Sequence, residues 1–466
     1  MPAPDGLPTP ARYYAMAAII LGLSLSVLDA TIVNLALPGI ARDMHASAAH
    51  SIWVVNAYQI AILALLLPLA MLGDIVGYRR VYLCGAALFT LASVGCALSS
   101  TLGELTAARA LQGLGASGIM AVNSAMVRLI YPRSRLGRGV AINSMVVAAS
   151  SVAGPSIAAA ILSVANWPWL FVVNLPLGAI AIALGSRALP RNAAPAPAGA
   201  RLRPADVAMN ALMFGLVFLG ADSLGTSSAG SGADWGGGVA LLTAGLAIGA
   251  IYVRRQWALA VPMLPLDLLR IPVFALSMCT SVAAFAAQTL SYISLPFLLL
   301  DAYGRSPLEA GLLITAWPLG VVATAPIAGR LIGRYPDGVL GGIGLGLLAA
   351  GLLLLALLPP HPASADIAWR MALCGVGFGL FQSPNNHTIV TTAPMHRAGG
   401  ASGMLGTARL TGQTLGAVLL ASIFSAAGAH TARGPAIAVA LAVAAGLAAI
   451  ASVFSSLRVR DRAVRV

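Results

Sequence analysis

Two ionisable side chains stand inside long apolar stretches of this chain. Asp29 lies in the apolar block 13–38, and Arg109 lies in the block 104–130. Burial in a medium of low dielectric constant favours the neutral form of a carboxyl group, which can then take up and release a proton near neutral pH. A guanidinium group keeps its charge in proteins and favours the ionised carboxylate when it is close. The pair predicts proton exchange at Asp29 controlled by Arg109, and a fixed buried ion pair that only joins two helices is the alternative.

Further polar side chains lie within the apolar blocks. Polar groups that face lipid are unfavourable, so some of these side chains must line a water-filled cavity. We therefore predict that the residues that bind a substrate are among Asn34, Tyr58, Gln112, Asn123, Gln288, Tyr292, Gln382 and Asn386.

Two glycine motifs in the apolar blocks have different interpretations. Gly113 to Gly118 matches GxGxxG, but it stands inside an apolar helical block with no strand before it. We interpret it as a surface for close helix packing, not as a dinucleotide site. Gly154 and Pro155 stand together in the middle of a block, where the proline predicts a kink at a tight helix seam.

The sequence argues against an enzyme. His387 and His396 have no acidic neighbours in the sequence, and the four cysteines lie inside apolar blocks without CxxC spacing. No cluster of histidines and carboxylates has the spacing of a metal site, and no nucleophile is accompanied by a base. We expect no catalytic residues, no metal and no cofactor. A sensor or scaffold is also disfavoured, because it would normally carry a sizeable soluble module.

The composition of the chain predicts which kind of secondary structure holds these residues. Only 9% of the 466 residues are charged and 59% are hydrophobic, whereas typical soluble domains are about 25% charged. The apolar blocks are about 20 residues long, enough to cross ~30 Å of hydrocarbon as a helix. The sequence therefore predicts an all-α integral membrane protein with about fourteen transmembrane helices.

The net charge of +13 comes from arginine, since the chain contains no lysine. The arginines stand in the short segments between apolar blocks, and most of them fall on the side of the two termini. This asymmetry predicts that both termini are cytoplasmic and that the protein is multi-pass. It also argues against nucleic acid as a partner. The segment 188–204 reads as a basic cytoplasmic linker, and 224–236 reads as an outside loop.

Several stretches together resemble the major facilitator superfamily, and within it the fourteen-span drug:proton antiporters of the multidrug efflux type. The similar stretches are LDATIVNLALP at 28–38, GDIVGYRR at 73–80, RALQG at 109–113, the pair Gly154-Pro155, WPWLFVVNLPLG at 167–178 and SPLEAG at 306–311. The similarity extends over nearly the whole chain.

The resemblance implies an N-terminal six-helix bundle at 1–187 and a pseudo-symmetric six-helix bundle with a basic tail at 273–466. The cytoplasmic linker and two central accessory helices would lie between them at 188–272. Asp29 and Arg109 would couple transport to protons. A latch between the domains would contain Asp74, Gly77, Arg79 and Arg80, and Gly154 with Pro155 would form a flexing seam.

The function that this resemblance implies is proton-coupled export of small hydrophobic drugs or toxic compounds by alternating access. Cationic substrates are expected because the buried carboxylate of Asp29 attracts them, and neutral or zwitterionic substrates stay open as alternatives. The expected place is the bacterial cytoplasmic (inner) membrane, and antibiotic resistance would be a consequence. The proton gradient would supply the energy, and the partners would be the lipid bilayer, protons and a small-molecule substrate. The alternative is a dedicated exporter of one metabolite, such as an antibiotic, a siderophore or an amino acid.

Overall fold

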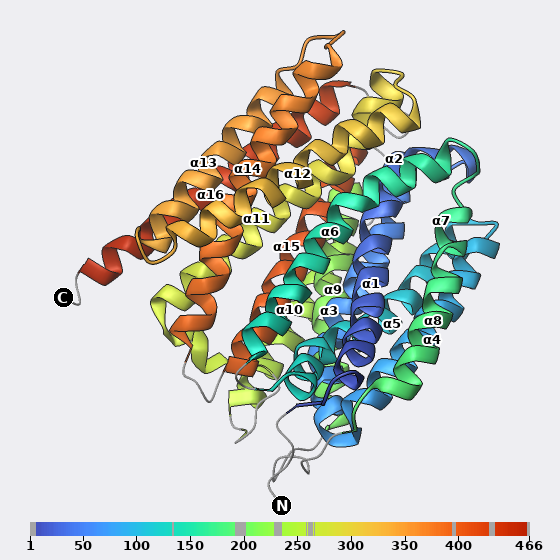
Figure 1. Cartoon of the computed structure of the whole chain (residues 1–466). Coiled ribbons are helices and arrows are strands. Elements are labelled where there is room, and N and C mark those ends of the chain that lie inside the picture. The colour runs from blue at the N-terminus through green and yellow to red at the C-terminus, as the bar shows by residue number, and fades with distance from the viewer. Residues whose placement is uncertain are drawn as a thin grey trace, which may run out of the picture. The chain divides into compact units, whose positions relative to one another are not determined.

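The computed structural model describes residues 6–132, 135–191, 202–227, 235–257, 259, 264, 266–393, 398–427 and 434–463. Within these ranges the regular structure is helical and contains no strand (Figure 1). The predicted all-α class is confirmed. Part of the predicted linker, 192–201, and part of the predicted outside loop, 228–234, lie outside the described residues.

The helices follow the apolar blocks. Their bounds are α1 (Ala11–Asp43), α2 (Ala48–Ser51), α3 (Trp53–Val76), α4 (Tyr78–Leu98), α5 (Leu102–Ile130), α6 (Leu136–Leu162), α7 (Trp169–Val172), α8 (Asn174–Ala188), α9 (Pro204–Ser227), α10 (Trp235–Trp257), the 3₁₀ turn η2 (Leu266–Arg270), α11 (Pro272–Pro296), the π-helical turn η3 (Phe297–Ala302), α12 (Pro307–Leu331), α13 (Asp337–Ala356), α14 (Ser364–Thr392), α15 (Ala398–Ala426) and α16 (Gly434–Ala463).

Capping boxes begin two of the long helices. At the start of α5, the Thr101 hydroxyl accepts from the Glu104 N–H at 3.2 Å, and the Glu104 carboxylate accepts from the Thr101 N–H at 3.3 Å. Ser306 and Glu309 make the same exchange at the start of α12. Each box satisfies backbone donors that a helix start leaves unpaired.

Within the described parts of the chain, twelve helical segments are long and apolar enough to cross a membrane. They are α1, α2 with α3, α4, α5, α6, α7 with α8, α9, α10, α11 with η3, α12, α13 and α16. The two other long helices of the described chain, α14 and α15, have 29 residues each and are not among these twelve. The multi-pass prediction is confirmed, and the count of about fourteen spans stays a prediction.

The chain folds into two compact units. Unit 1 is 1–33, 53–216 and 244–263, and unit 2 is 34–52, 217–243 and 264–466. The residues of α1, α9 and α10 are therefore divided between the two units. The domain boundaries predicted above, 1–187, 188–272 and 273–466, stay a prediction.

Glycines bring the helix backbones of unit 1 together. A Cβ atom added at Gly85 of α4 would lie 2.8 Å from the carbonyl oxygen of Gly115 in α5, and one added at Gly118 would lie 3.0 Å from Gly85 Cα. Gly85 has no room for a side chain, and a side chain at Gly118 would require the backbone of α4 to give way. These contacts confirm that Gly115 and Gly118 serve helix packing, as the sequence predicted for the GxGxxG motif.

Unit 2 contains similar close contacts. A Cβ added at Gly344 of α13 would lie 2.6 Å from the Gly377 carbonyl oxygen of α14, and one added at Gly320 of α12 would lie 2.6 Å from the Ala372 carbonyl oxygen. α14 is therefore packed against both α12 and α13 at positions where only glycine fits.

Candidate functional site

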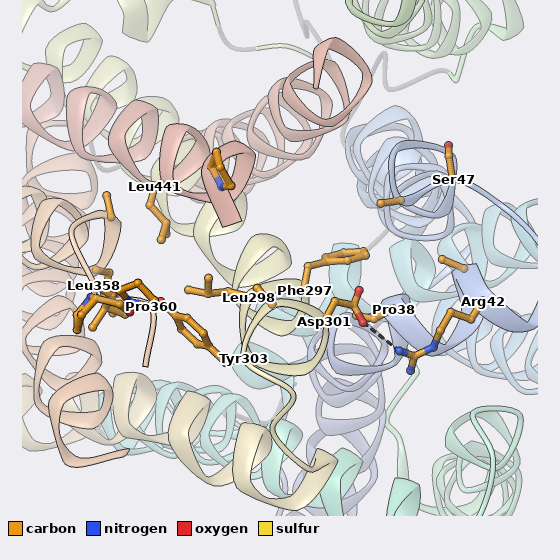
Figure 2. A pocket seen from close by; sticks show the side chains of 18 of the residues that line it. Pro38, Arg42, Ser47, Phe297, Leu298, Asp301, Tyr303, Leu358, Pro360 and Leu441 are labelled. Carbon is orange, nitrogen blue, oxygen red and sulfur yellow. Dashed lines mark hydrogen bonds and ion pairs between the residues drawn. The ribbon is translucent and has the colours of Figure 1, made fainter. Parts of the chain in front are cut away.

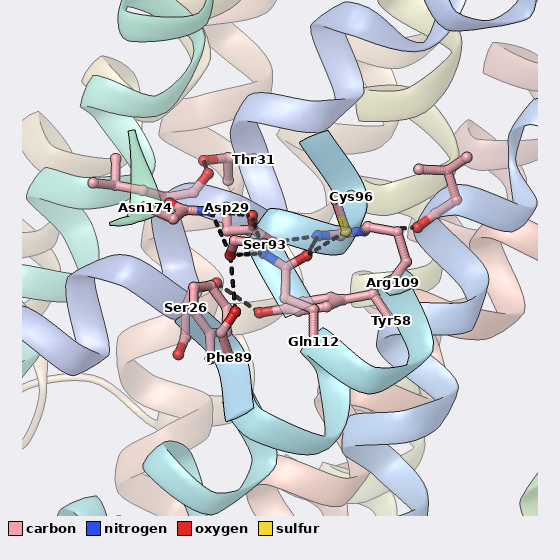
Figure 3. A network of polar contacts seen from close by, with 12 residues as sticks. Ser26, Asp29, Thr31, Tyr58, Phe89, Ser93, Cys96, Arg109, Gln112 and Asn174 are labelled. Carbon is pink, nitrogen blue, oxygen red and sulfur yellow. Dashed lines mark hydrogen bonds and ion pairs between the residues drawn. The ribbon is translucent and has the colours of Figure 1, made fainter. Parts of the chain in front are cut away.

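Asp29 of α1 is the centre of a buried polar cluster in unit 1 (Figure 3). Arg109 Nη1 of α5 donates to Asp29 Oδ2 in a direct ion pair. Two amides share the other oxygen: Gln112 Nε2 donates to Oδ1 at 2.9 Å, and Asn174 Nδ2 of α8 donates to it at 2.8 Å. Asp29 and Arg109 are each 1% exposed. A carboxyl that accepts on both oxygens has the bonding of its ionised form.

The guanidinium of Arg109 has partners besides the carboxylate. Its Nε donates to the Val54 carbonyl of α3 at 3.0 Å, and Nη1 also donates to Gln112 Oε1 at 2.5 Å. Its Cζ lies 4.1 Å from the centroid of the Tyr58 ring and 5.8 Å from that of Phe171. Aromatic faces attract cations, and the attraction is stronger away from water. These groups would therefore still stabilise the charge of Arg109 if Asp29 became neutral.

Ser93 adds α4 to the cluster, and Tyr58 makes a further contact from α3. Ser93 Oγ of α4 accepts from Gln112 Nε2 at 2.9 Å and from Asn174 Nδ2 at 3.5 Å. The Tyr58 hydroxyl of α3 donates to the Ser26 carbonyl of α1 at 3.0 Å. Five helices, α1, α3, α4, α5 and α8, therefore meet around one carboxylate. A change in its charge alters the hydrogen bonding of several helices at once.

The structure brings together four of the predicted residues here: Asp29, Arg109, Tyr58 and Gln112. Sequence reasoning missed Asn174 and Ser93. Asn174 stands in the stretch 167–178 that carried the resemblance, which was the available signal for it. Ser93 gave no signal, because a serine in an apolar helix is most often bonded to its own backbone, as Ser93 Oγ is to the Phe89 carbonyl at 2.9 Å.

The residues predicted to form a latch lie at the turn between α3 and α4. Gly77 has φ of +105°, a conformation that favours glycine. The Tyr78 hydroxyl donates to Asp74 Oδ1 at 2.5 Å, and Arg79 Nη2 donates to the Ser186 carbonyl of α8. The side chain of Arg80 is exposed. The contacts of Asp74 and Arg79 are thus with other groups of unit 1, and the role of a latch stays a prediction.

The predicted seam lies in α6, where Gly154 contacts α1. Gly154 and Pro155 are buried, and a Cβ added at Gly154 would overlap the hydroxyl of Thr31 in α1. Thr31 is two residues from Asp29 along α1. α1 and α6 therefore touch through a glycine at a position two residues from Asp29 along α1, although residues two apart do not share a helix face.

The other predicted substrate-binding residues are spread over both units. In unit 1, Asn123 Nδ2 of α5 donates to Asn143 Oδ1 of α6 at 2.9 Å. In unit 2, the Tyr292 ring lies 5.0 Å from the Trp317 ring between centroids. The remaining four are half-buried: Asn34 on α1, Gln288 on α11, and Gln382 and Asn386 on α14.

Unit 2 contains a cavity of about 780 Å³ near the end of α1 (Figure 2). Its walls are mostly apolar and include Pro38, Phe297, Leu298 and Leu441. Arg42 Nη1 and Asp301 Oδ1 form an ion pair at 3.0 Å on its wall, and Asp301 belongs to the π-helical turn η3. The eight predicted substrate-binding residues are not among those that line this cavity.

Comparisons with known proteins identify the family. The sequence profile of the Major Facilitator Superfamily matches residues 19–417 and 276–465. The uncharacterized transporter YebQ of Escherichia coli (strain K12) is 53% identical over 459 residues, which cover 98% of this chain and 97% of that protein. Multidrug resistance protein Stp of Mycobacterium tuberculosis (strain CDC 1551 / Oshkosh) is 31% identical, over 87% of this chain and 74% of that protein.

A solved structure gives the same fold. The crystal structure of a POT family transporter in complex with a thioalcohol-conjugated peptide superposes with a TM-score of 0.71 over 94% of each chain, at 14% sequence identity. Together with the buried ion pair in a bundle of apolar helices, these similarities identify the chain as a multi-pass membrane transporter that belongs to the Major Facilitator Superfamily.

Proposed function

We propose that this transporter is a proton-coupled exporter, an antiporter, of small hydrophobic and cationic compounds. The observation that carries the proposal is the contact of Asp29 with Arg109, Gln112 and Asn174 in a site closed to water. An ionisable group within a membrane span is costly, and such groups commonly mark proton pathways. The proton gradient supplies the energy, and the mechanism requires no cofactor.

Protonation of Asp29 provides the coupling step. The proton binds to a carboxylate oxygen and removes the negative charge that holds Arg109 Nη1. The bonds from Gln112 and Asn174 to Oδ1 weaken at the same time, since neutral acceptors bind donors less strongly than charged ones. α1 is then released from α5 and α8. Arg109 keeps the Val54 carbonyl, Gln112 Oε1 and the Tyr58 ring, which lowers the cost of leaving its charge without a counter-ion.

Alternating access follows if α1 moves when its carboxylate changes charge. The contact of Gly154 with Thr31 gives α1 a narrow surface on which to shift against α6. A positively charged substrate favours the ionised form of Asp29. A proton that enters from outside neutralises the carboxylate, and the site then binds the cationic substrate less strongly. Proton entry and substrate exit are thereby made to alternate.

The class of substrate has two supports. The cavity of about 780 Å³ in unit 2 has mainly apolar walls, which suit hydrophobic compounds of varied shape. The relative Stp is named as a multidrug resistance protein. We therefore propose that this chain is an exporter that confers antibiotic resistance, in the bacterial inner membrane with both termini in the cytoplasm, as the distribution of arginine indicates.

The test is efflux of ethidium from cells that express the wild type, Asp29→Asn or Asp366→Asn, with and without a protonophore. Asp366 is the matched control, because it is a carboxylate at the start of α14 that pairs with Arg370 at 3.1 Å. We expect the protonophore and Asp29→Asn to abolish efflux at equal expression, whereas Asp366→Asn pumps like the wild type.

Efflux by Asp29→Asn at the wild-type rate would show that the coupling role of Asp29 is wrong. If the wild type itself moves no dye, the cation-exporter proposal fails, and a dedicated exporter of one metabolite is the better description.

A further inference from the structure

A second cavity of unit 2, of about 380 Å³, lies where α12 is followed by α13. Its walls come from the turn before α13, the start of α13, the last part of α14 and the late residues of α16. The chemistry-bearing residues on these walls are Arg334, Asp337, His387, Thr388 and Arg458. None of them belongs to the cluster around Asp29.

Arg458 is a buried cation with neutral hydrogen-bond partners. It is 3% exposed. Its Nη1 donates to Asn385 Oδ1 at 2.7 Å and to Ser277 Oγ at 3.0 Å, while Nη2 and Nε donate to the hydroxyl and carbonyl oxygens of Ser455 at 2.5 and 3.3 Å. Among the described residues these bonds use four of the five N–H groups of a guanidinium. One N–H donor of the guanidinium has no hydrogen bond among the described residues, and the Arg458 charge also interacts with the Asp337 carboxylate.

The first turn of α13 also faces this cavity. Pro336, Asp337 and Gly338 are among the lining residues, and the helix that begins there has 20 residues. The N–H groups of Val339 and Leu340 both donate to the Pro336 carbonyl, at 2.9 and 3.2 Å. The N–H groups of Asp337 and Gly338 precede the first helical hydrogen bonds. The start of a helix carries partial positive charge and binds anions through such donors.

One carboxylate, that of Asp337, lines the cavity, and it already accepts hydrogen bonds from two side chains. Asp337 Oδ2 accepts from His387 Nδ1 at 2.8 Å and from Thr388 Oγ1 at 2.9 Å. The guanidinium charges of Arg334 and Arg458 exceed this single negative charge by one. The described walls of the cavity are therefore net positive.

We propose that this cavity binds a phosphate-type oxyanion. Two guanidinium groups, an imidazole and the N–H groups of a helix start converge on it, and guanidinium forks match the oxygens of phosphate. The ligand is either free inorganic phosphate or the phosphate of an anionic lipid headgroup, because the cavity lies at the ends of membrane-spanning helices. Either source bridges α13, α14 and α16 through the same oxygens.

The test measures thermal unfolding of the purified full chain in detergent and in lipid nanodiscs. In detergent, sodium phosphate is compared with sodium chloride at equal ionic strength. In nanodiscs, phosphatidylcholine alone is compared with phosphatidylcholine that contains phosphatidylglycerol. The variants are Arg458→Gln, Arg334→Ala and the matched control Arg330→Ala, an exposed arginine at the same end of α12 that does not line the cavity.

We expect phosphate or phosphatidylglycerol to raise the unfolding temperature of the wild type, and Arg334→Ala to raise the half-saturating concentration by about fivefold or more. Arg330→Ala should change it little. A rise with phosphate in detergent assigns the free anion, and a rise only with phosphatidylglycerol assigns the headgroup. Arg334→Ala, an exposed position, keeps the test decisive if Arg458→Gln fails to fold. The proposal is overturned if neither probe stabilises the wild type, or if Arg330→Ala and Arg334→Ala weaken stabilisation equally.

Discussion

Asn210 Nδ2 of α9 donates to the backbone carbonyl of Ala64 in α3 at 2.6 Å, four residues before Pro68. Proline has no N–H, so the carbonyl four residues earlier loses its helical donor. Asn210 is 0% exposed and supplies the missing donor from another helix of the same unit. One of the two predicted accessory helices therefore completes the hydrogen bonding of α3, the helix that carries Tyr58 and the Val54 carbonyl of the Asp29 cluster.

Replacing Asn210 by leucine should leave the Ala64 carbonyl buried and unpaired. We expect a loss of about 1–3 kcal/mol in unfolding free energy, the usual cost of an unsatisfied buried polar group. In a Pro68→Ala background the helix regains its own N–H, so Asn210→Leu should cost far less. Thermal unfolding of the four proteins measures the difference, and an equal cost in both backgrounds would contradict the explanation.

Arg109→Lys should stop transport although it keeps the charge. Lysine cannot reproduce the fork that reaches Asp29, Gln112 and the Val54 carbonyl together. We expect a drop in dye efflux of about tenfold or more, because with a strained or lost ion pair the position of α5 no longer depends on the charge of Asp29. Arg128→Lys, at the exposed end of the same helix, is the matched control and should retain efflux.

Gly154→Ala should slow efflux by filling the seam between α6 and α1. The added methyl group would overlap the Thr31 hydroxyl, so α1 must shift or its movement must stop. Thr31→Ala removes that hydroxyl and should restore part of the efflux in the double variant, while Thr31→Ala alone stays close to the wild type. Unchanged efflux in Gly154→Ala would show that this seam does not limit transport.

The Arg42–Asp301 and Asp29–Arg109 ion pairs should differ in their effect on stability. Arg42 and Asp301 are 66% and 31% exposed, so Asp301→Asn should change the free energy of unfolding by less than about 1 kcal/mol. Asp29→Asn leaves the buried Arg109 charge without its partner and should cost about 3–5 kcal/mol, reduced by the remaining partners of Arg109. Thermal unfolding of both variants tests the contrast, and similar losses would contradict it.

The sequence was sufficient to predict the helices, because long apolar blocks must span the bilayer as helices. It was also sufficient to predict the pairing of Asp29 with Arg109. A charge in an apolar block must find a partner, and Asp29 and Arg109 are the clearest charges well inside their blocks. Asn174 and Ser93 were not predicted, because neutral amides and hydroxyls in a helix have many possible partners and only the packing of α4 and α8 selects one. The number of spans is harder for a related reason: Asn385, Asn386 and His387 make α14 less apolar than its neighbours.

The arginine in the last span was also out of reach of pattern reasoning. Arg458 appeared to belong to a basic tail, where solvated side chains are the rule. The structure buries it among Ser277, Asn385 and Ser455, from three different helices. Its environment depends on contacts between residues more than 70 positions apart, as the separation of 73 from Asn385 shows.

The glycine contacts between α4 and α5 also limit which mutations this protein can accept during evolution. Gly85 and Gly115 tolerate no side chain, and a side chain at Gly118 would require the backbone of α4 to shift, so a mutation at any of the three needs a compensating change in the opposite helix. Ser93 and Gln112 are carried on these two helices and keep a fixed spacing as a result. New substrate preferences should therefore arise more readily from replacements elsewhere than from replacements at these three glycines.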